Sequence, residues 1–225
     1  MKLAEYRERA EAIVDEHCAK PGQTVRNWAA SWHGIFSLLI EGRCSPNGSL
    51  EGRGVFEPCS LIVARWEFLG CLLIGHSRAR SKRDQALEYA RRFLEPVNSR
   101  YTEPHPSIAQ TMQVCELLFQ MIRNGSLHGF TPSGVYDDSS DNCIGFGLCY
   151  SGAGSRHLTF SESDALLVDA TQLLDEFTRS MHLFARHLDD NKPGLDGKSA
   201  CDNFREGFRW RFAPSPSGKG VVVPW

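Results

Sequence analysis

The stretch Ser161–Asp190, "SESDALLVDATQLLDEFTRSMHLFARHLDD", carries the strongest structural signal in the chain. Its apolar residues recur at intervals of three and four positions, in the series Leu166, Ala170, Leu173, Phe177, Met181, Phe184 and Leu188. This spacing puts them on one face of an α-helix, and Ser161 with Asp164 resembles a capping box at its start. The pattern predicts a long amphipathic helix that ends by Asp190.

Other segments show helical periodicity or an apolar run of helical length. Helices are predicted over Lys2–Ala19, Thr24–Leu39, Ser60–Gly75 and a basic segment that ends before Pro96. Another is predicted over 107–123, "SIAQTMQVCELLFQMIR", on the spacing of Ile108, Met112, Cys115, Phe119 and Ile122. Glycine and proline make the segment Arg43–Pro58 a predicted loop. The fold class is therefore mainly α.

The residues after Gly129 have a different texture. Segment 130–142 is predicted to be a loop, and 143–150 with 156–161 to be two short strands of a hairpin. "FREGFRWRF", 204–212, is predicted to be a short C-terminal strand before a Pro/Gly/Ser-rich tail. The expected organisation is a helical domain over 1–190, with a β-hairpin insertion at about 143–160, and a C-terminal extension over 191–225.

Composition narrows the classes of protein that fit. The 225 residues have a formal net charge of -2 and a pI near 6.4, which argues against nucleic-acid binding through overall charge. No apolar run is long enough to span a bilayer, and the N-terminus lacks a secretory h-region, so we expect a cytoplasmic protein with no membrane contact. The eight cysteines form no CxxC pair, and HExxH is absent. We therefore expect reduced thiols and no metal site.

The string "IRNGSLHG", 122–129, stands where the apolar pattern of 107–123 stops. Asn124-Gly125 can end a helix, and an arginine in the final turn suits the negative end of the helix dipole. On that reading Arg123 and His128 are ordinary residues at a junction. The whole string also permits a functional interpretation.

Arg123-Asn124-Gly125-Ser126-Leu127-His128 resembles the R-x4-6-H motif of the HEPN superfamily (higher eukaryotes and prokaryotes nucleotide-binding domains). The resemblance implies a compact HEPN-like helical bundle that dimerises around the motif. In many members this makes a metal-independent endoribonuclease that acts in RNA processing, in toxin-antitoxin systems or in defence against phage. Other members are catalytically silent modules for dimerisation, nucleotide binding or protein interaction.

The chemistry explains why these residue types suit RNA cleavage. Histidine as a residue type titrates near neutral pH, so His128 would be the general acid or base while the 2'-hydroxyl attacks the phosphate. The fork of donors on Arg123 matches the phosphate oxygens and their developing charge, and Asn124 would orient either partner. Ser126 is a further polar contributor. The basic residues Arg78, Arg80, Lys82 and Arg83 are expected either to contact RNA or to form a solvated helix face. No cofactor is expected.

Geometry adds a requirement. Residues five apart on a continuous helix differ in direction by about 140°. Arg123 and His128 therefore share a cleft if the helix breaks at Asn124-Gly125 and a second chain completes the site. The expected partners are a second copy, RNA, and an antitoxin or other protein. A third interpretation is an unrelated helical domain whose Asn-Gly turn imitates the motif.

Overall fold

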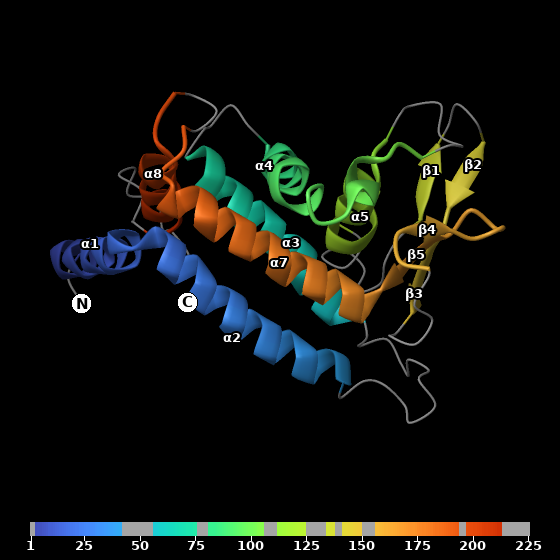
Figure 1. Cartoon of the computed structure of the whole chain (residues 1–225), viewed down its shortest axis with the longest axis horizontal. Helices are drawn as coiled ribbons and strands as arrows, with labels where there is room; N and C mark the ends of the chain where they lie inside the picture. The colour runs from blue at the N-terminus through green and yellow to red at the C-terminus, as the bar shows by residue number, and fades with distance from the viewer. Residues whose placement is uncertain are drawn as a thin grey trace.

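The computed structural model describes residues 3–41, 56–75, 81–105, 112–124, 134–137, 141–149, 156–193 and 197–212. Within these ranges the chain is mainly helical, with short strands gathered at one end (Figure 1). The α-helices are α1 (Leu3–Ala19), α2 (Pro21–Glu41), α3 (Phe56–Ile74), α4 (Lys82–Tyr89), α5 (Val114–Leu118), α7 (Ala170–Asp189) and α8 (Ala200–Phe212). The predicted fold class, mainly α with a small β insertion, is confirmed.

Non-α helical turns extend or connect these helices. A π-helical segment, η2 (Ala90–Leu94), continues α4, and a second one, η4 (Phe119–Asn124), continues α5. A short 3-10 turn, η3 (Ser99–Thr102), follows η2. The helix predicted to end before Pro96 is therefore present as α4 and η2.

Helix α7 lies beside α2 and also packs against α3 (Figure 1). Its apolar stripe is buried as the spacing predicts, at Leu173, Phe177, Met181, Phe184 and Leu188. Burying such a stripe is the main source of helix stability in a folded protein. The helix ends at Asp189, in agreement with the predicted end.

The start of α7 differs from the prediction. Residues Leu166–Asp169 form strand β5, so the helix begins only at Ala170. The N-cap is Asp169, whose Oδ1 accepts hydrogen bonds from the backbone N–H groups of Thr171 and Gln172 at 2.9 and 3.0 Å. Leu166 fits the helical spacing, but its neighbours Leu167 and Val168 equally suit a strand, and pairing with other strands decided the outcome.

The strand pairing also corrects the predicted hairpin at 143–160. Strand β3 (Phe146–Cys149) pairs in parallel with β5, and β4 (Thr159–Phe160) pairs antiparallel with the opposite edge of β5. The two predicted strands are thus separated by a third one. That central strand lay hidden in an apolar run that also matched a helix.

A second sheet lies partly in a segment predicted to be a loop. Strand β1 (Val135–Asp137) pairs antiparallel with β2 (Asn142–Ile144). The prediction of a loop over the whole of 130–142 is therefore wrong at β1 and at Asn142, whereas the rest of β2 lies in a segment predicted to be a strand. Three-residue strands are too short for alternation to reveal them.

The helix predicted over 107–123 begins later than its periodicity suggests. Gln113 forms an antiparallel bridge with Pro104, and the N–H of His105 donates to the carbonyl of Met112 at 2.9 Å. Helix α5 then starts at Val114. Met112 and Gln113 use their backbone groups for this bridge, which overrides the helical spacing, and 106–111 lie outside the described residues.

Helix α3 crosses the centre of the molecule. It begins at Phe56, so the segment predicted to be a loop ends before Pro58, which sits in the first turn where its missing N–H costs nothing. Trp66, Leu69 and Leu73 are buried along its length. Helices α4 and α8 both pack against it.

The C-terminal segment predicted to be a strand is instead helix α8. Phe204 and Phe208, four residues apart, are both buried and belong to the same core cluster as α3 and α7. Gly207 permits a close approach, because a Cβ built there would lie 2.5 Å from the carbonyl oxygen of Cys71. The segment was predicted to be a strand, but Phe204 and Phe208 both lie against the ring of Trp28 on α2, and residues four apart are neighbours on a helix but not on a strand.

Candidate functional site

Arg123, the first residue of the predicted motif, lies in the last turn of the π-helical segment η4, which packs against α3. Its Nη2 donates a hydrogen bond to Oε2 of Glu67 on α3 at 2.8 Å. The guanidinium also lies over the ring of Phe119, 5.5 Å from the ring centroid. The Arg123 side chain is only 17% exposed, so it is held at the edge of the core.

Glu67 receives two more cations. Nη2 of Arg211, in the last turn of α8, lies 3.2 Å from Glu67 Oε1, and Nζ of Lys82, at the start of α4, lies 3.7 Å from the same oxygen. We call Glu67, Lys82, Arg123 and Arg211 the Glu67 cluster. It joins four elements that are far apart in the chain.

Local structure positions the outer members of the cluster. Lys82 begins α4 behind a capping box, in which Ser81 Oγ accepts from the N–H of Asp84 at 3.1 Å and Asp84 Oδ2 accepts from the N–H of Ser81 at 3.2 Å. Arg211 is carried by α8, whose Phe208 is buried. The capping box thus fixes where α4 and Lys82 begin, and the buried ring of Phe208 anchors α8, which carries Arg211.

Among the described residues that form the cluster, cations outnumber carboxylates. One carboxylate faces two guanidinium groups and one ammonium group, and the side-chain exposure rises from 17% at Arg123 to 23% at Arg211 and 62% at Lys82. The cluster is therefore largely shielded from solvent at Arg123 and exposed to solvent at Lys82. Chemically, it suits an anion with several oxygens, such as a phosphate group.

The other predicted site residues are placed only in part. Arg83 of α4 forms its ion pair with Glu116 of α5, so it does not join the Glu67 cluster. Asn124 is the last residue of η4, and its side chain lies outside the described residues. The remaining predicted site residues also lie outside them, namely Arg78, Arg80, Ser126 and His128.

Sequence reasoning missed Glu67 and Arg211. Glu67 had a recognisable signal, because it is an acidic residue inside the nearly continuous apolar run of Ser60–Gly75. A buried carboxylate requires a partner, so such a residue predicts a contact with a cation. Arg211 had no comparable signal, since its segment was predicted to be a strand.

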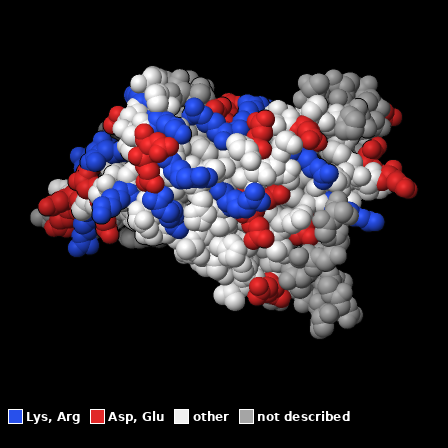
Figure 2. All heavy atoms as spheres, in the orientation of Figure 1, with Lys and Arg blue, Asp and Glu red and all other residues white. Residues whose placement is uncertain are grey.

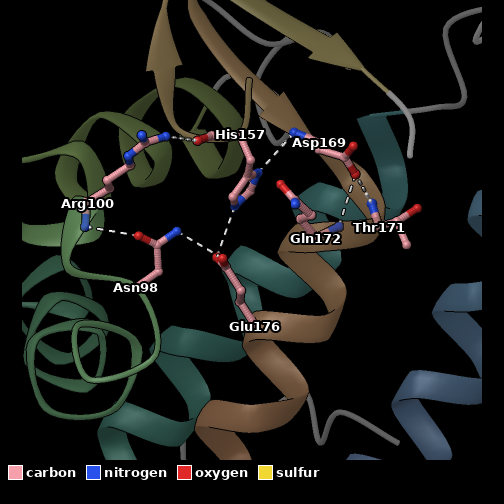
Figure 3. A network of polar contacts seen from close by, with 7 residues as sticks. All are labelled: Asn98, Arg100, His157, Asp169, Thr171, Gln172 and Glu176. Carbon is pink, nitrogen blue, oxygen red and sulfur yellow. Dashed lines mark hydrogen bonds and ion pairs between the residues drawn. The ribbon is translucent and has the colours of Figure 1, made fainter. Parts of the chain in front are cut away.

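A second polar network, shown in Figure 3, joins the three-stranded sheet to the helices around His157. The His157 Nδ1 accepts a hydrogen bond from the backbone N–H of Asp169 at 3.0 Å, which assigns the proton to Nε2. Nε2 then donates to Oε2 of Glu176 on α7 at 3.0 Å. The other Glu176 oxygen accepts from Asn98 at 2.9 Å, and Arg100 donates to the His157 carbonyl at 3.0 Å.

This network has the properties of a structural connection. His157 and Asp169 are buried, and both ring nitrogens of His157 have partners. Burial by itself would raise the pKa of Glu176, but the hydrogen bonds from His157 and Asn98 outweigh it, and the pKa lies below its usual value. We therefore assign the network to stability.

The lowered pKa of Glu176 predicts a pH dependence of stability. A carboxylate whose pKa is lower in the folded state stabilises the protein above the unfolded-state pKa, and this contribution is lost as the pH falls through the folded-state value. We expect Glu176→Gln to destabilise the protein at pH 7, and the difference from wild type to shrink below about pH 4.5. Urea unfolding at several pH values measures it. The exposed neighbour substitution Asp175→Asn is the control, and a difference that stayed constant with pH would refute the assignment.

Burial makes three of the described cysteines poor nucleophiles. The described thiols are Cys18, Cys59, Cys71, Cys115, Cys143, Cys149 and Cys201, and all are free. Burial raises the pKa of Cys59 and Cys115 to about 12 and that of Cys18 to about 11. A thiolate is the reactive form, so these three are inert packing residues at neutral pH.

A surface hollow of about 290 Å³ lies where α1 meets α2, next to Trp28. Its lining includes His17, Lys20 and Gln23, and none of the predicted site residues. The described residues also contain no group of three or more His, Cys, Asp or Glu side chains that could hold a metal ion. The Glu67 cluster therefore remains the candidate functional site.

Comparisons with protein-family models, curated proteins and solved structures found no match for this chain. Within the described part of the chain, no helix has the length and apolar character needed to cross a membrane. The features of this chain that bear on function are therefore the motif at 123–128 and the contacts of Arg123 in the Glu67 cluster.

Proposed function

We propose that the chain is a metal-independent endoribonuclease of the HEPN type, which cleaves RNA through attack of the 2'-hydroxyl on the neighbouring phosphate. The observation that carries this proposal is the Glu67 cluster, where Arg123 lies beside two further cations and one carboxylate. The gathering of three cations at one carboxylate, as the described residues show it, favours binding of a phosphodiester. The context would be a toxin, RNA processing or defence against phage.

The surface charge agrees with a local site. Figure 2 shows basic and acidic side chains interspersed over much of one face, and a largely uncharged edge where α2 lies. On such a face, RNA would be held mainly where cations outnumber carboxylates. The Glu67 cluster has that property among the ion pairs of the described residues.

Each motif residue has a role in the proposed reaction. His128 acts as general acid or base, Arg123 stabilises the charge that develops on the phosphorane, and Asn124 orients the phosphate or His128. Ser126 contributes a further polar contact, and the basic segment around Arg83 lies on the path of the RNA. A homodimer would bring two copies of the motif into one cleft.

A second candidate function is a catalytically silent HEPN-like module that dimerises or binds a nucleotide or a protein. It is favoured by the 2.8 Å contact between Arg123 and the buried carboxylate of Glu67. An arginine with such a partner stabilises the fold whether or not it also contacts a substrate. The two candidates differ in whether the chain cuts RNA.

Cleavage of a mixed RNA substrate in EDTA tests the proposal. Wild type should cut, and His128→Ala and Arg123→Ala should each lower the rate roughly 100-fold or more. Arg209→Ala is the control, because this exposed arginine pairs with Glu11 away from the cluster. Sedimentation at micromolar concentration should show a dimer.

The possible results separate the interpretations. Cleavage that survives both motif substitutions would remove Arg123 and His128 from the mechanism. A wild-type protein that cuts no RNA would favour the silent module. A strictly monomeric protein would refute the composite site.

A further inference from the structure

The ion pairs of the described residues are mostly one to one. Arg209 pairs with Glu11, Arg205 with Asp15 and Arg83 with Glu116, while Arg26 pairs with Asp189. These contacts neutralise each charge locally. They lie mostly on the surface, where such pairs add little to stability.

Glu67 departs from this pattern. Its two oxygens lie 2.8 Å from Arg123 and 3.2 Å from Arg211, and Lys82 lies 3.7 Å away. The Glu67 side chain is 8% exposed, so water cannot fully screen these charges. Among the ion pairs of the described residues, three cations therefore share this one carboxylate.

We propose that Glu67 is a positioning residue that holds Arg123 and Arg211 side by side, so that these two arginines and Lys82 together bind a phosphodiester group of single-stranded RNA. The choice of RNA as the ligand rests on the proposed function. The assignment of Glu67, Lys82 and Arg211 to one site rests on their contacts. None of these three residues belongs to the sequence motif, and Glu67 and Arg211 were not among the predicted site residues.

Two guanidinium groups that lie close together repel each other, because both are positively charged. A carboxylate between them gives each a hydrogen-bond acceptor and offsets this repulsion, so their positions are set before a ligand arrives. A phosphate has oxygens enough for both forks, and Lys82, the most exposed member, supplies a further point charge at the open side. Helix α8 thereby takes part in binding the phosphodiester through Arg211.

Binding is measured by fluorescence anisotropy of a labelled single-stranded RNA in EDTA, over a series of salt concentrations. All proteins carry His128→Ala, so the result does not depend on cleavage. Arg211→Gln and Lys82→Gln should each weaken binding about tenfold and lower the salt slope by about 0.7. Arg209→Gln removes the same charge from α8 outside the cluster. It should change neither the affinity for RNA nor the salt slope by as much.

Glu67→Gln distinguishes positioning from simple charge. The substitution removes a negative charge, so charge alone would tighten binding of RNA. Loss of positioning would instead weaken it about tenfold, because the two guanidinium groups separate. Tighter binding by Glu67→Gln would overturn the positioning role.

Arg211→Lys provides a variant that keeps the charge in case Glu67→Gln does not fold. It should weaken RNA binding while leaving the salt slope nearly unchanged, because lysine retains the charge but lacks the planar fork. Binding by Arg211→Gln and Lys82→Gln that matches Arg209→Gln would overturn the site. Binding of inorganic phosphate, measured by calorimetry, without any binding of RNA would overturn the assignment to a polymer. RNA binding that depends on the cluster, in a wild type that does not cut, would support the site and refute only the nuclease.

Discussion

Phe208→Ala should lower the free energy of unfolding by about 4 kcal/mol, the usual cost of removing a buried aromatic side chain. Phe208 is 1% exposed, and its ring lies 5.2 Å from that of His17 and 6.0 Å from those of Trp28 and Phe204. The cavity left by alanine would be lined by α1, α2 and α8. Thermal unfolding should show a Tm lower by roughly 10 °C.

Arg209→Ala, one residue further along α8, is the matched control. Its exposed ion pair with Glu11 should contribute less than about 1 kcal/mol. The comparison also tests the predicted boundary between a domain over 1–190 and an extension over 191–225. If 1–190 were a unit independent of α8, Phe208→Ala would leave its unfolding unchanged.

Gly70→Ala should cost about 3 kcal/mol. A Cβ built at Gly70 on α3 would lie 1.9 Å from the carbonyl oxygen of Gln85 and 2.4 Å from its carbonyl carbon on α4. Both are backbone atoms, so no side-chain rotation relieves the overlap, and the two helices must move apart. Urea unfolding of wild type and variant measures the loss.

Gly34→Ala is the control for this substitution. Gly34 lies within α2, and a Cβ there would meet nothing within 4 Å. Alanine in a helix interior is favoured over glycine by about 1 kcal/mol, so this variant should be more stable than wild type. If Gly70→Ala were also stabilising, the close approach of α3 and α4 would be wrong.

Gly70 and Phe208 also help to place members of the Glu67 cluster. Gly70 lies three residues after Glu67, where α4 approaches α3 and brings Lys82 near the carboxylate. Phe208 lies three residues before Arg211 on α8. Loosening either contact should therefore weaken the proposed binding of RNA as well as stability.

The C-terminal segment shows where local pattern reached its limit. The aromatic residues of 204–212 fit a strand or a helix, because Phe204, Phe208 and Phe212 are four apart while charged residues alternate with aromatic ones near the end. The close contact at Gly207 and the buried rings of Phe204 and Phe208 select the helix. The contact at Gly207 comes from Cys71 on α3, and the ring of Phe208 lies against His17 on α1 and Trp28 on α2. All these partners are far away in the sequence, so no local pattern contains them.

Two members of the candidate site, Arg123 of the motif and Lys82 of the basic segment, were named from the sequence. Arg123 was recognised because it follows an apolar helix and precedes Asn124-Gly125, and its place in the last turn of η4 is confirmed. Glu67 could be suspected as a charge in an apolar run, but its partners could not be named. Arg211 reaches Glu67 across 144 positions of sequence, which only the fold can bring together.

The sequence by itself determined the helical class and the long amphipathic helix that organises the core. Periodicity of apolar residues expresses burial of one face, and this physical preference is local. Tertiary structure decided where strand β5 replaced the first predicted turns before Ala170, that 200–212 became α8, and which cations meet Glu67. Those outcomes depend on pairing and charge contacts between distant segments, whose free energies exist only after the chain has folded.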